Sequence, residues 1–125
     1  TNCDSLIMKL GSEGFIAYDR MQSNFIKSQS FPALSVNPVD VTGAGDSLIS
    51  CMALAISSGV PFMDAAVLGS FISSIAVESL GNKPISSSQL KNFLNNFCLL
   101  YNVYLCKVPI HLRTLLTIIT VWVLE

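Results

Sequence analysis

Apolar and polar positions divide the first third of the chain into short extended segments. Apolar residues dominate "DSLIMKL", Asp4–Leu10, which predicts a mostly buried strand, and the turn "GSEG", Gly11–Gly14, ends it. A second strand is predicted over Phe15–Asp19. Partial alternation predicts a third, more exposed strand over Asn24–Phe31. The first third of the chain is therefore predicted to be β-structure.

The middle of the chain has the length and composition of two successive helices. The two prolines of "PALSVNPVD" disfavour helix, so this segment should run extended into the next turn. Ala44–Ser58 is predicted to be helical and, because nearly every position is apolar or small, buried on most sides. Asp64 is expected to cap or open a second helix that runs to Ser79. Its small residues permit close packing against a neighbour.

A third helix is predicted after a loop at Leu80–Pro84. Ser86 fits the N-cap of a capping box, with Gln89 reaching back to it, and the helix should continue to about Phe97. Beyond Asn95 the composition changes, with many β-branched residues and few caps. Residues 98–125 are therefore assigned to an apolar tail to which the sequence gives no role.

Two features of the chain ends bear on its organisation. The last apolar run, Leu115–Leu124, is far shorter than the roughly 20 residues of a membrane-spanning helix, so no membrane partner is expected. The chain opens at Thr1, without an initiator methionine, almost directly into a strand. That beginning favours a start in the middle of a domain.

Composition limits the class of protein. The chain is 51% hydrophobic and 12% charged, against about 25% charged for an average soluble domain. This suits the interior part of a larger α/β domain or a protein with an extensive partner contact. The net charge of −1 and the absence of a basic stripe argue against a nucleic-acid partner.

Cysteine and histidine give no sign of a metal centre. Four cysteines are present without zinc-like spacing: Cys3, Cys51, Cys98 and Cys106. Reduced thiols in a cytoplasmic protein are the simplest interpretation. The single histidine, His111, is interpreted as structural rather than catalytic.

The stretch "VDVTGAGDSL", residues 39–48, carries the strongest chemical signal. Gly43, Ala44 and Gly45 lack bulky side chains, so a ligand can approach the backbone where the predicted helix begins. The unpaired N–H groups and the positive end of the helix dipole favour an anion there. Asp46, in the same turn, could take a proton from a hydroxyl. From these residues alone, an ordinary first-turn acid beside a tight bend remains an alternative, and no Walker motif is present.

"NPVDVTGAGDSL" resembles the signature of the ribokinase-like (PfkB) carbohydrate kinases. The stretches "KLGSEGF" upstream and "VESLGNKPIS" downstream are also similar to this family. Together the three stretches look most like the heptose-phosphate kinase branch. The resemblance covers about residues 4–94. It implies an α/β fold, the incomplete C-terminal portion of a ribokinase-like (Rossmann-like) three-layer α/β/α domain, spanning residues 1–97.

The resemblance also implies a reaction: ATP-dependent phosphorylation of a hydroxyl on a sugar or sugar phosphate, with heptose 7-phosphate one candidate. Asp46 would be the catalytic base, and Gly43, Ala44 and Gly45, with the Asp46 amide, the anion hole. ATP with Mg²⁺ would be the phosphoryl donor. The nucleotide-contacting positions would be Gly11, Ser12, Thr42, Gly43 and Gly45.

The resemblance further implies a monovalent cation, usually potassium, beside the anion hole. Its ligands, mostly backbone oxygens, would come from Asp40, Thr42, Ala76, Ser79 and Gly81. The alternative for Asp40 is an ordinary acidic residue in an extended loop. The alternative for Ser12 is an ordinary turn residue. Glu13, next to Ser12, is expected to be solvated.

Members of this family are typically more than twice as long, and their N-terminal half supplies the sugar site and a β-strand lid. A gene fragment, a split gene or a shifted reading frame is therefore expected, with a homodimer as one assembly. Three functions stay open: the catalytic portion of a sugar kinase, a non-catalytic nucleotide-binding or pseudokinase remnant, and an interaction module with apolar docking surfaces.

Overall fold

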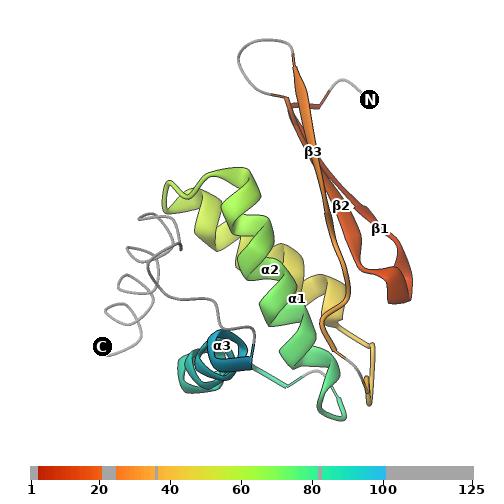
Figure 1. Ribbon diagram of the computed structural model, residues 1–125, viewed down its shortest axis with the longest axis vertical. Coiled ribbons are helices and arrows are strands. Elements are labelled where there is room, and N and C mark those ends of the chain that lie inside the picture. Colours follow the sequence, from red (N-terminus) through yellow and green to blue (C-terminus); the bar gives the residue numbers. More distant parts are fainter. Residues whose placement is uncertain (1–2, 21–24, 36, 82, 101–125) are drawn as a thin grey trace.

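The computed structural model describes residues 3–20, 25–35, 37–81 and 83–100, and it combines a small sheet with helices (Figure 1). Its elements are β1 Ser5–Lys9, the 3-10 turn η1 Gly11–Glu13, β2 Phe15–Arg20, β3 Ile26–Phe31, α1 Ala44–Ser57, α2 Phe62–Val77 and α3 Ser87–Leu100. The predicted α/β class is confirmed, in the form of a partial ribokinase-like fold. In Figure 1 one side of the sheet lies toward α1 and α2, and α3 lies away from the sheet.

The three strands form an antiparallel meander in the order β1-β2-β3. Lys9 pairs with Phe15 across the first turn, and Phe15 pairs in turn with Phe31. The Leu10 amide donates to the Gly14 carbonyl at 2.8 Å, which closes this turn. Gly14 has φ 95° and ψ −127°, and a Cβ there would overlap the backbone that follows β3. Only glycine fits this position without strain.

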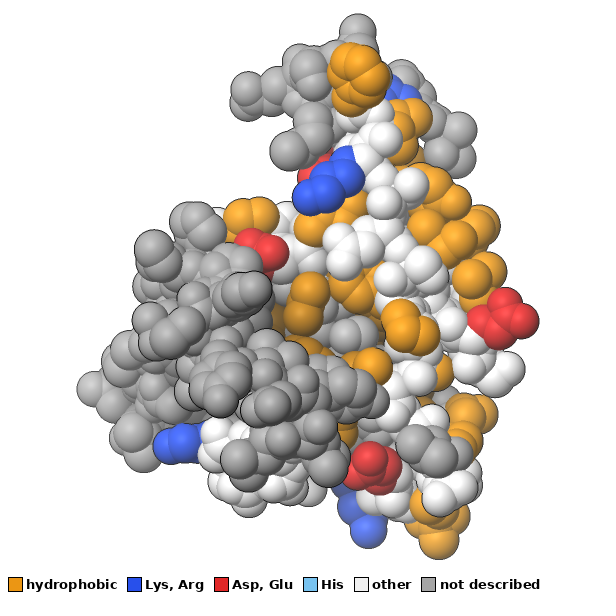
Figure 2. Space-filling view, in the orientation of Figure 1, with side chains coloured by type: hydrophobic (Ala, Val, Ile, Leu, Met, Phe, Trp, Pro, Cys, Tyr) orange, Lys and Arg blue, Asp and Glu red, His pale blue; other side chains and the backbone are white. Residues whose placement is uncertain are grey.

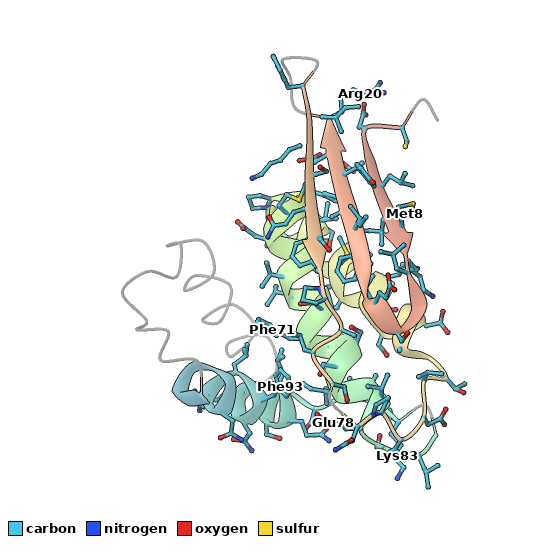
Figure 3. The ribbon with its side chains drawn as sticks, turned by 45° about the vertical axis from the view of Figure 1, so that its right-hand side comes forward. Met8, Arg20, Phe71, Glu78, Lys83 and Phe93 are labelled. Atoms are coloured by element: carbon cyan, nitrogen blue, oxygen red, sulfur yellow. The ribbon has the colours of Figure 1, made fainter. Side chains whose placement is uncertain are left out.

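One face of the sheet packs on the helices. Phe15 and Phe31 stack with ring centroids 4.9 Å apart, and Ala17 beside them is fully buried. On the opposite face Leu6 and Met8 remain about 40% exposed, and Figure 3 shows Met8 on the side of β1 away from the helices. The prediction of a mostly buried first strand is wrong, because strand side chains alternate and one face is covered here.

Helices α1 and α2 pack closely against each other through Gly69. A Cβ on Gly69 would lie 3.0 Å from Cγ of Met52 and 3.3 Å from Cγ of Leu48, both on α1. The predicted close packing of the second helix is therefore confirmed. The core that they share with the sheet consists of Phe15, Ala17, Phe31, Leu48, Met52, Ala55, Val60, Met63, Ala65, Ala66 and Leu68.

Helix α1 leaves several apolar side chains exposed. Ile49, Leu54 and Ile56 are 58%, 69% and 43% exposed, and Figure 2 shows hydrophobic side chains over much of the described surface. The prediction that the first helix is buried on most sides is wrong. Apolar composition shows which faces favour burial, and the described elements cover one side of this helix.

Helix α2 begins earlier than predicted. It starts at Phe62, after Pro61 at the N-cap, and no side chain caps it. Asp64 lies within the first turn and neither caps nor opens the helix. Proline favours a helix start because it lacks the N–H that would be unpaired there.

Helix α3 begins with the predicted capping box. The Ser86 amide donates to Oε1 of Gln89 at 2.8 Å, and the Gln89 amide donates to Oγ of Ser86 at 3.3 Å. The helix continues to Leu100, beyond the predicted end at Phe97. Phe93 meets Phe71 of α2 with ring centroids 6.0 Å apart, and Figure 3 shows the two side chains facing each other.

The predictions for the end of the chain fall largely outside the described residues. His111, Cys106 and the run Leu115–Leu124 lie there, as does the predicted tail from residue 101 onward. Among the residues that the structure does describe, no helix has both the length and the apolar character needed to cross a bilayer.

Candidate functional site

The small-residue turn forms the start of α1, as predicted. Gly43 is the N-cap with φ 80° and ψ −5°, a left-handed conformation that favours glycine. Its carbonyl accepts the Ser47 amide at 2.9 Å, the first hydrogen bond of the helix. The Ala44 amide donates to the Val41 carbonyl at 3.4 Å. The amides of Gly45 and Asp46 lie in the first turn, where an α-helix provides no acceptor, at the positive end of the dipole. The turn therefore has the geometry of an anion cradle.

Asp46 lies in the first turn of α1 with an exposed side chain. A carboxylate is electrostatically favoured at this end of a helix. It lines an open groove of about 510 Å³, which is also lined by Ser50 and Leu54 of α1, by Lys83 and by Ser87. A hydroxyl-bearing ligand in this groove would have the carboxylate within reach.

Cys51 also lines this groove, but burial raises the pKa of its thiol to about 11. Because the thiolate is the reactive form, Cys51 is not suited to act as a nucleophile. The predicted reduced thiol is found at this position, where Cys51 is free.

The second predicted motif lies beside the first. Gly11 and Ser12, both exposed, form the η1 turn directly after β1. From the end of β1, the Lys9 side chain reaches Gly45. A Cβ added to Gly45 would overlap Nζ of Lys9 and lie 3.2 Å from its Cε. The two motifs are therefore separated by no more than the reach of one lysine side chain.

Asp40 joins the segment before α1 to the loop after α2. Its Oδ1 accepts the Thr42 amide at 2.9 Å, and its Oδ2 accepts the Gly81 amide at 3.1 Å. The Val39 and Asp40 amides both donate to the Val77 carbonyl, at 2.7 and 3.2 Å. Hydrogen bonds from Thr42, and then from Gly81, hold the pKa of the Asp40 carboxyl below its ordinary value of 3.8.

The residues expected to hold a monovalent cation gather around this connection. Asp40, Thr42 and Gly81 are joined by hydrogen bonds. Ala76 is buried in the last turn of α2 and Ser79 directly follows its C-cap. Each carboxylate oxygen of Asp40 keeps lone pairs beyond the N–H that it accepts, so this donor set suits a hard cation. Within the described ranges, no three His, Cys, Asp or Glu side chains group as ligands for a metal ion.

Sequence reasoning missed two contributors to this region. Lys9 lies over the turn at Gly45, although it is the first letter of the quoted phrase "KLGSEGF". Lys83 lines the same groove as Asp46. Neither has a spacing signal, because both reach the site through long side chains from other elements.

Comparison with known proteins gives a consistent result. The model of the pfkB family carbohydrate kinases matches residues 2–88. An uncharacterized sugar kinase of Buchnera aphidicola is 37% identical over 65 residues, which cover 52% of this chain and 21% of that protein. Bifunctional protein HldE of Methylobacillus flagellatus is 30% identical over 93 residues, covering 74% of this chain and 18% of that protein.

Solved structures agree on the fold. The ribokinase of Thermotoga maritima superposes with a TM-score of 0.63 at 28% identity, over 74% of this chain and 30% of that one. Phosphofructokinase-2 of Escherichia coli, solved in complex with potassium, superposes with a TM-score of 0.62 at 18% identity, over 74% of this chain and 28% of that one.

The chain thus spans about a fifth of the two curated relatives and about 30% of the solved ribokinase. The matched residues include β1 to α2, and with them the turn at Gly43–Asp46 and the Asp40 connection. This chain belongs to the pfkB family of carbohydrate kinases.

Proposed function

We propose that this chain carries the phosphoryl-transfer portion of an ATP-dependent carbohydrate kinase. The observation that supports this most is the start of α1, where left-handed Gly43 opens the first turn and Asp46 stands exposed within it. Asp46 acts as the base, and the Gly43–Gly45 backbone with the Asp46 amide forms the anion hole. Phosphoryl transfer depends mainly on positioning and charge stabilisation, and this turn offers both.

ATP with Mg²⁺, when bound, supplies the phosphoryl group. Asp46 accepts the proton of the substrate hydroxyl as the oxygen of that hydroxyl bonds to the γ-phosphorus and the bond to the ADP oxygen breaks. The amides of the turn stabilise the negative charge on the transferred group. Gly11, Ser12 and Thr42 contact the nucleotide.

A monovalent cation, potassium, is held beside the turn by Asp40, Thr42 and the backbone near Ala76, Ser79 and Gly81. The hydrogen bonds that Asp40 accepts from Thr42 and Gly81 support this role, because they hold the carboxylate among these positions. A cation at this place fixes the segment between Asp40 and Gly43 and adds positive charge near the anion hole.

The complete enzyme would be a three-layer α/β/α domain to which this chain contributes the C-terminal part, through the end of α3 at Leu100. The sugar site belongs to the portion outside this chain. Similarity to HldE favours a sugar phosphate such as heptose 7-phosphate as substrate. A cytoplasmic location and a homodimer fit the same proposal.

The test is ADP formation by this chain joined to the sugar-binding portion of a family kinase, with ATP, Mg²⁺, K⁺ and a panel of sugars and sugar phosphates. Asp46→Asn should abolish turnover and leave ATP binding intact. Asp64→Asn is the matched control, since Asp64 also lies in the first turn of a helix. Equal loss in both variants, or no loss in Asp46→Asn, would contradict the role of Asp46.

The chain spans only a small share of the length of its relatives. This favours a second candidate function, a nucleotide-binding remnant without catalysis. ATP binding without turnover on any substrate would support that remnant. Binding of neither nucleotide nor sugar would favour an interaction module instead.

A further inference from the structure

Strand β1 is an edge of the sheet and has a neighbour on one side only among the described strands (Figure 1). The Asp4 carbonyl accepts the Arg20 amide at 2.7 Å, and the Leu10 amide donates to the Gly14 carbonyl at 2.8 Å. In an antiparallel pair, alternate residues direct both backbone groups to the same neighbour. The even-numbered residues of β1 therefore bond to β2, and the odd-numbered ones direct N–H and C=O to the open edge. These are Ser5, Ile7 and Lys9.

The composition of this edge favours pairing with a further strand. Proteins protect free edges with proline, bulges or charged side chains. The centre of β1 is apolar, and its one charged residue stands at its end. Leu6 and Met8 remain 40% and 41% exposed on the face of the sheet away from the helices. The other edge strand, β3, is rich in polar side chains: Lys27, Ser28, Gln29 and Ser30.

The sequence of β1 is complementary to itself. In an antiparallel pair of two copies centred on Ile7, Ile7 meets its own copy and Ser5 meets Lys9. These are the residues with outward backbone groups, so each such pair exchanges two N–H···O bonds. In the same register Leu6 meets Met8 on the open face, which brings apolar side chains together. A second copy therefore satisfies the backbone groups and the apolar face at once.

The charges also fit this register. The two Lys9 side chains lie at opposite ends of the paired strands and do not face each other. Each lies opposite Ser5 of the second copy, whose hydroxyl donates to Oδ1 of Asp19 at 2.8 Å. Asp19 pairs with Ser5 from β2, one strand further on. The ammonium of one copy thus approaches a carboxylate of the other, and opposite charges stabilise a strand pair.

We infer that β1 is a dimerisation strand, and that two copies of this chain pair antiparallel about Ile7 to join their three-stranded sheets into one. The dimer goes beyond the proposed function and does not depend on it, since neither Asp40 nor Asp46 belongs to this surface. Another occupant of the same edge would be a strand from the sugar-binding portion of a kinase, and it would compete with the second copy.

The experiment is sedimentation velocity of the full chain over a range of concentrations, together with hydrogen exchange. A monomer–dimer equilibrium is expected, in which the amide of Ile7 exchanges more slowly as the dimer forms. The matched control is the amide of Ser28, which faces outward from β3 by the same alternation and should keep its rate at every concentration.

Paired substitutions test the register. Leu6→Lys/Met8→Lys places like charges opposite each other and should weaken dimerisation about tenfold. Leu6→Glu/Met8→Lys places opposite charges at the same positions and should restore dimerisation to within a few-fold of the original chain. Ile26→Lys/Ser28→Lys is the matched control, because it adds two lysines to the same face on the other edge strand, and it should leave dimerisation unchanged. Circular dichroism should show all three variants folded, since these positions are partly or fully exposed.

Each contrary outcome is distinct. A chain that stays monomeric, or a dimer in which Ile7 still exchanges at the monomer rate, would overturn the inference. Equal weakening in the two double-lysine variants would reduce the effect to net charge and overturn the register. If the chain is monomeric and the N-terminal portion of a family kinase slows exchange at Ile7, the edge belongs to that portion and not to a second copy. None of these results bears on Asp46, which ADP formation tests separately.

Discussion

The Asp40 carboxylate accepts the amide of Gly81, a residue 41 positions further along the chain, at 3.1 Å. Its other oxygen accepts the amide of Thr42 at 2.9 Å. One side chain therefore fixes the approach to the anion-binding turn and the loop that follows α2. Removing it should release both segments together.

Asp40→Asn should lower the free energy of unfolding at neutral pH, because an amide oxygen is a weaker acceptor than a carboxylate. The folded-state pKa of Asp40 lies below its ordinary value. The contribution of the charged form is therefore present above that value and is lost as pH falls through the lowered pKa. Denaturant unfolding of both chains from pH 7 down to about pH 2 should show the difference shrinking at acid pH. If the free energies of unfolding of the two chains differed by the same amount at every pH, the role of the charged Asp40 carboxylate would be contradicted. Asp64→Asn is the control, because it removes one carboxylate at another place.

Gly14→Ala should destabilise the sheet strongly. The added Cβ would meet the Phe31 carbonyl, and it would lie 2.7 Å from the Ala33 nitrogen and 2.8 Å from the Pro32 carbonyl carbon, none of which can rotate away. We expect a loss of about 3 kcal/mol or more from overpacking and backbone strain. Gly11→Ala is the control. Gly11 also has a positive φ, but a Cβ added there would have no atom within 4 Å, so this variant should lose about 1–2 kcal/mol of stability. Thermal unfolding of the two variants would show similar losses if the clash were unimportant.

Gly69→Val should separate α1 from α2. Cγ of Met52 and Cγ and the carbonyl oxygen of Leu48 lie within 3.4 Å of the position of a Cβ there, so a larger side chain forces the helices apart. The expected cost is about 1–3 kcal/mol beyond the change in helix propensity. Ala53→Val, on the exposed side of α1, introduces a valine without that contact and provides the comparison. Equal denaturation midpoints would argue against tight packing at Gly69.

Ser86→Ala should weaken α3 selectively, by about 1 kcal/mol, because the capping hydroxyl accepts the Gln89 amide. Hydrogen exchange should speed up in the first turn of α3, while amides in α2 keep their protection. Ser88→Ala, two residues later, is a useful comparison. Its hydroxyl meets that of Ser86 but accepts no helix amide in the described structure. If exchange rose equally throughout α2 and α3, the cap would not act locally.

The features that the sequence predicted well depend on neighbours along the chain. The small-residue turn at the start of α1 follows from small residues before an apolar run, and the Ser86–Gln89 box follows from three-residue spacing. Helix α1 begins at the predicted residue for the same reason. Residues close together in the sequence determine these features, so the features could be predicted from a single sequence.

The features that the sequence did not reveal depend on contacts between distant segments. Leu6 on β1 and Leu54 on α1 are apolar, yet both are exposed, because burial depends on what covers a face and not on its composition alone. Lys9 reaches Gly45 only because β1 ends beside the start of α1. The hydrogen bond between Asp40 and Gly81 likewise has no signal in spacing. The resemblance to a known family pointed to Asp40 and Gly81, and it gave no role to Lys9.

Among the described residues, the three strands of the sheet end at Phe31, before the first α-helix begins. Ribosomes add about 5–20 residues per second from the N-terminus, whereas a β-hairpin forms in roughly 1–10 μs. The strands of the nascent chain can therefore pair while α1 is still being translated. Gly81 is synthesised roughly two to eight seconds after Asp40, as follows from their separation of 41 residues and that rate. During translation the residues of the turn at Gly43 are therefore present for seconds before the partner of Asp40 is made, so the connection between Asp40 and Gly81 can form only after that delay.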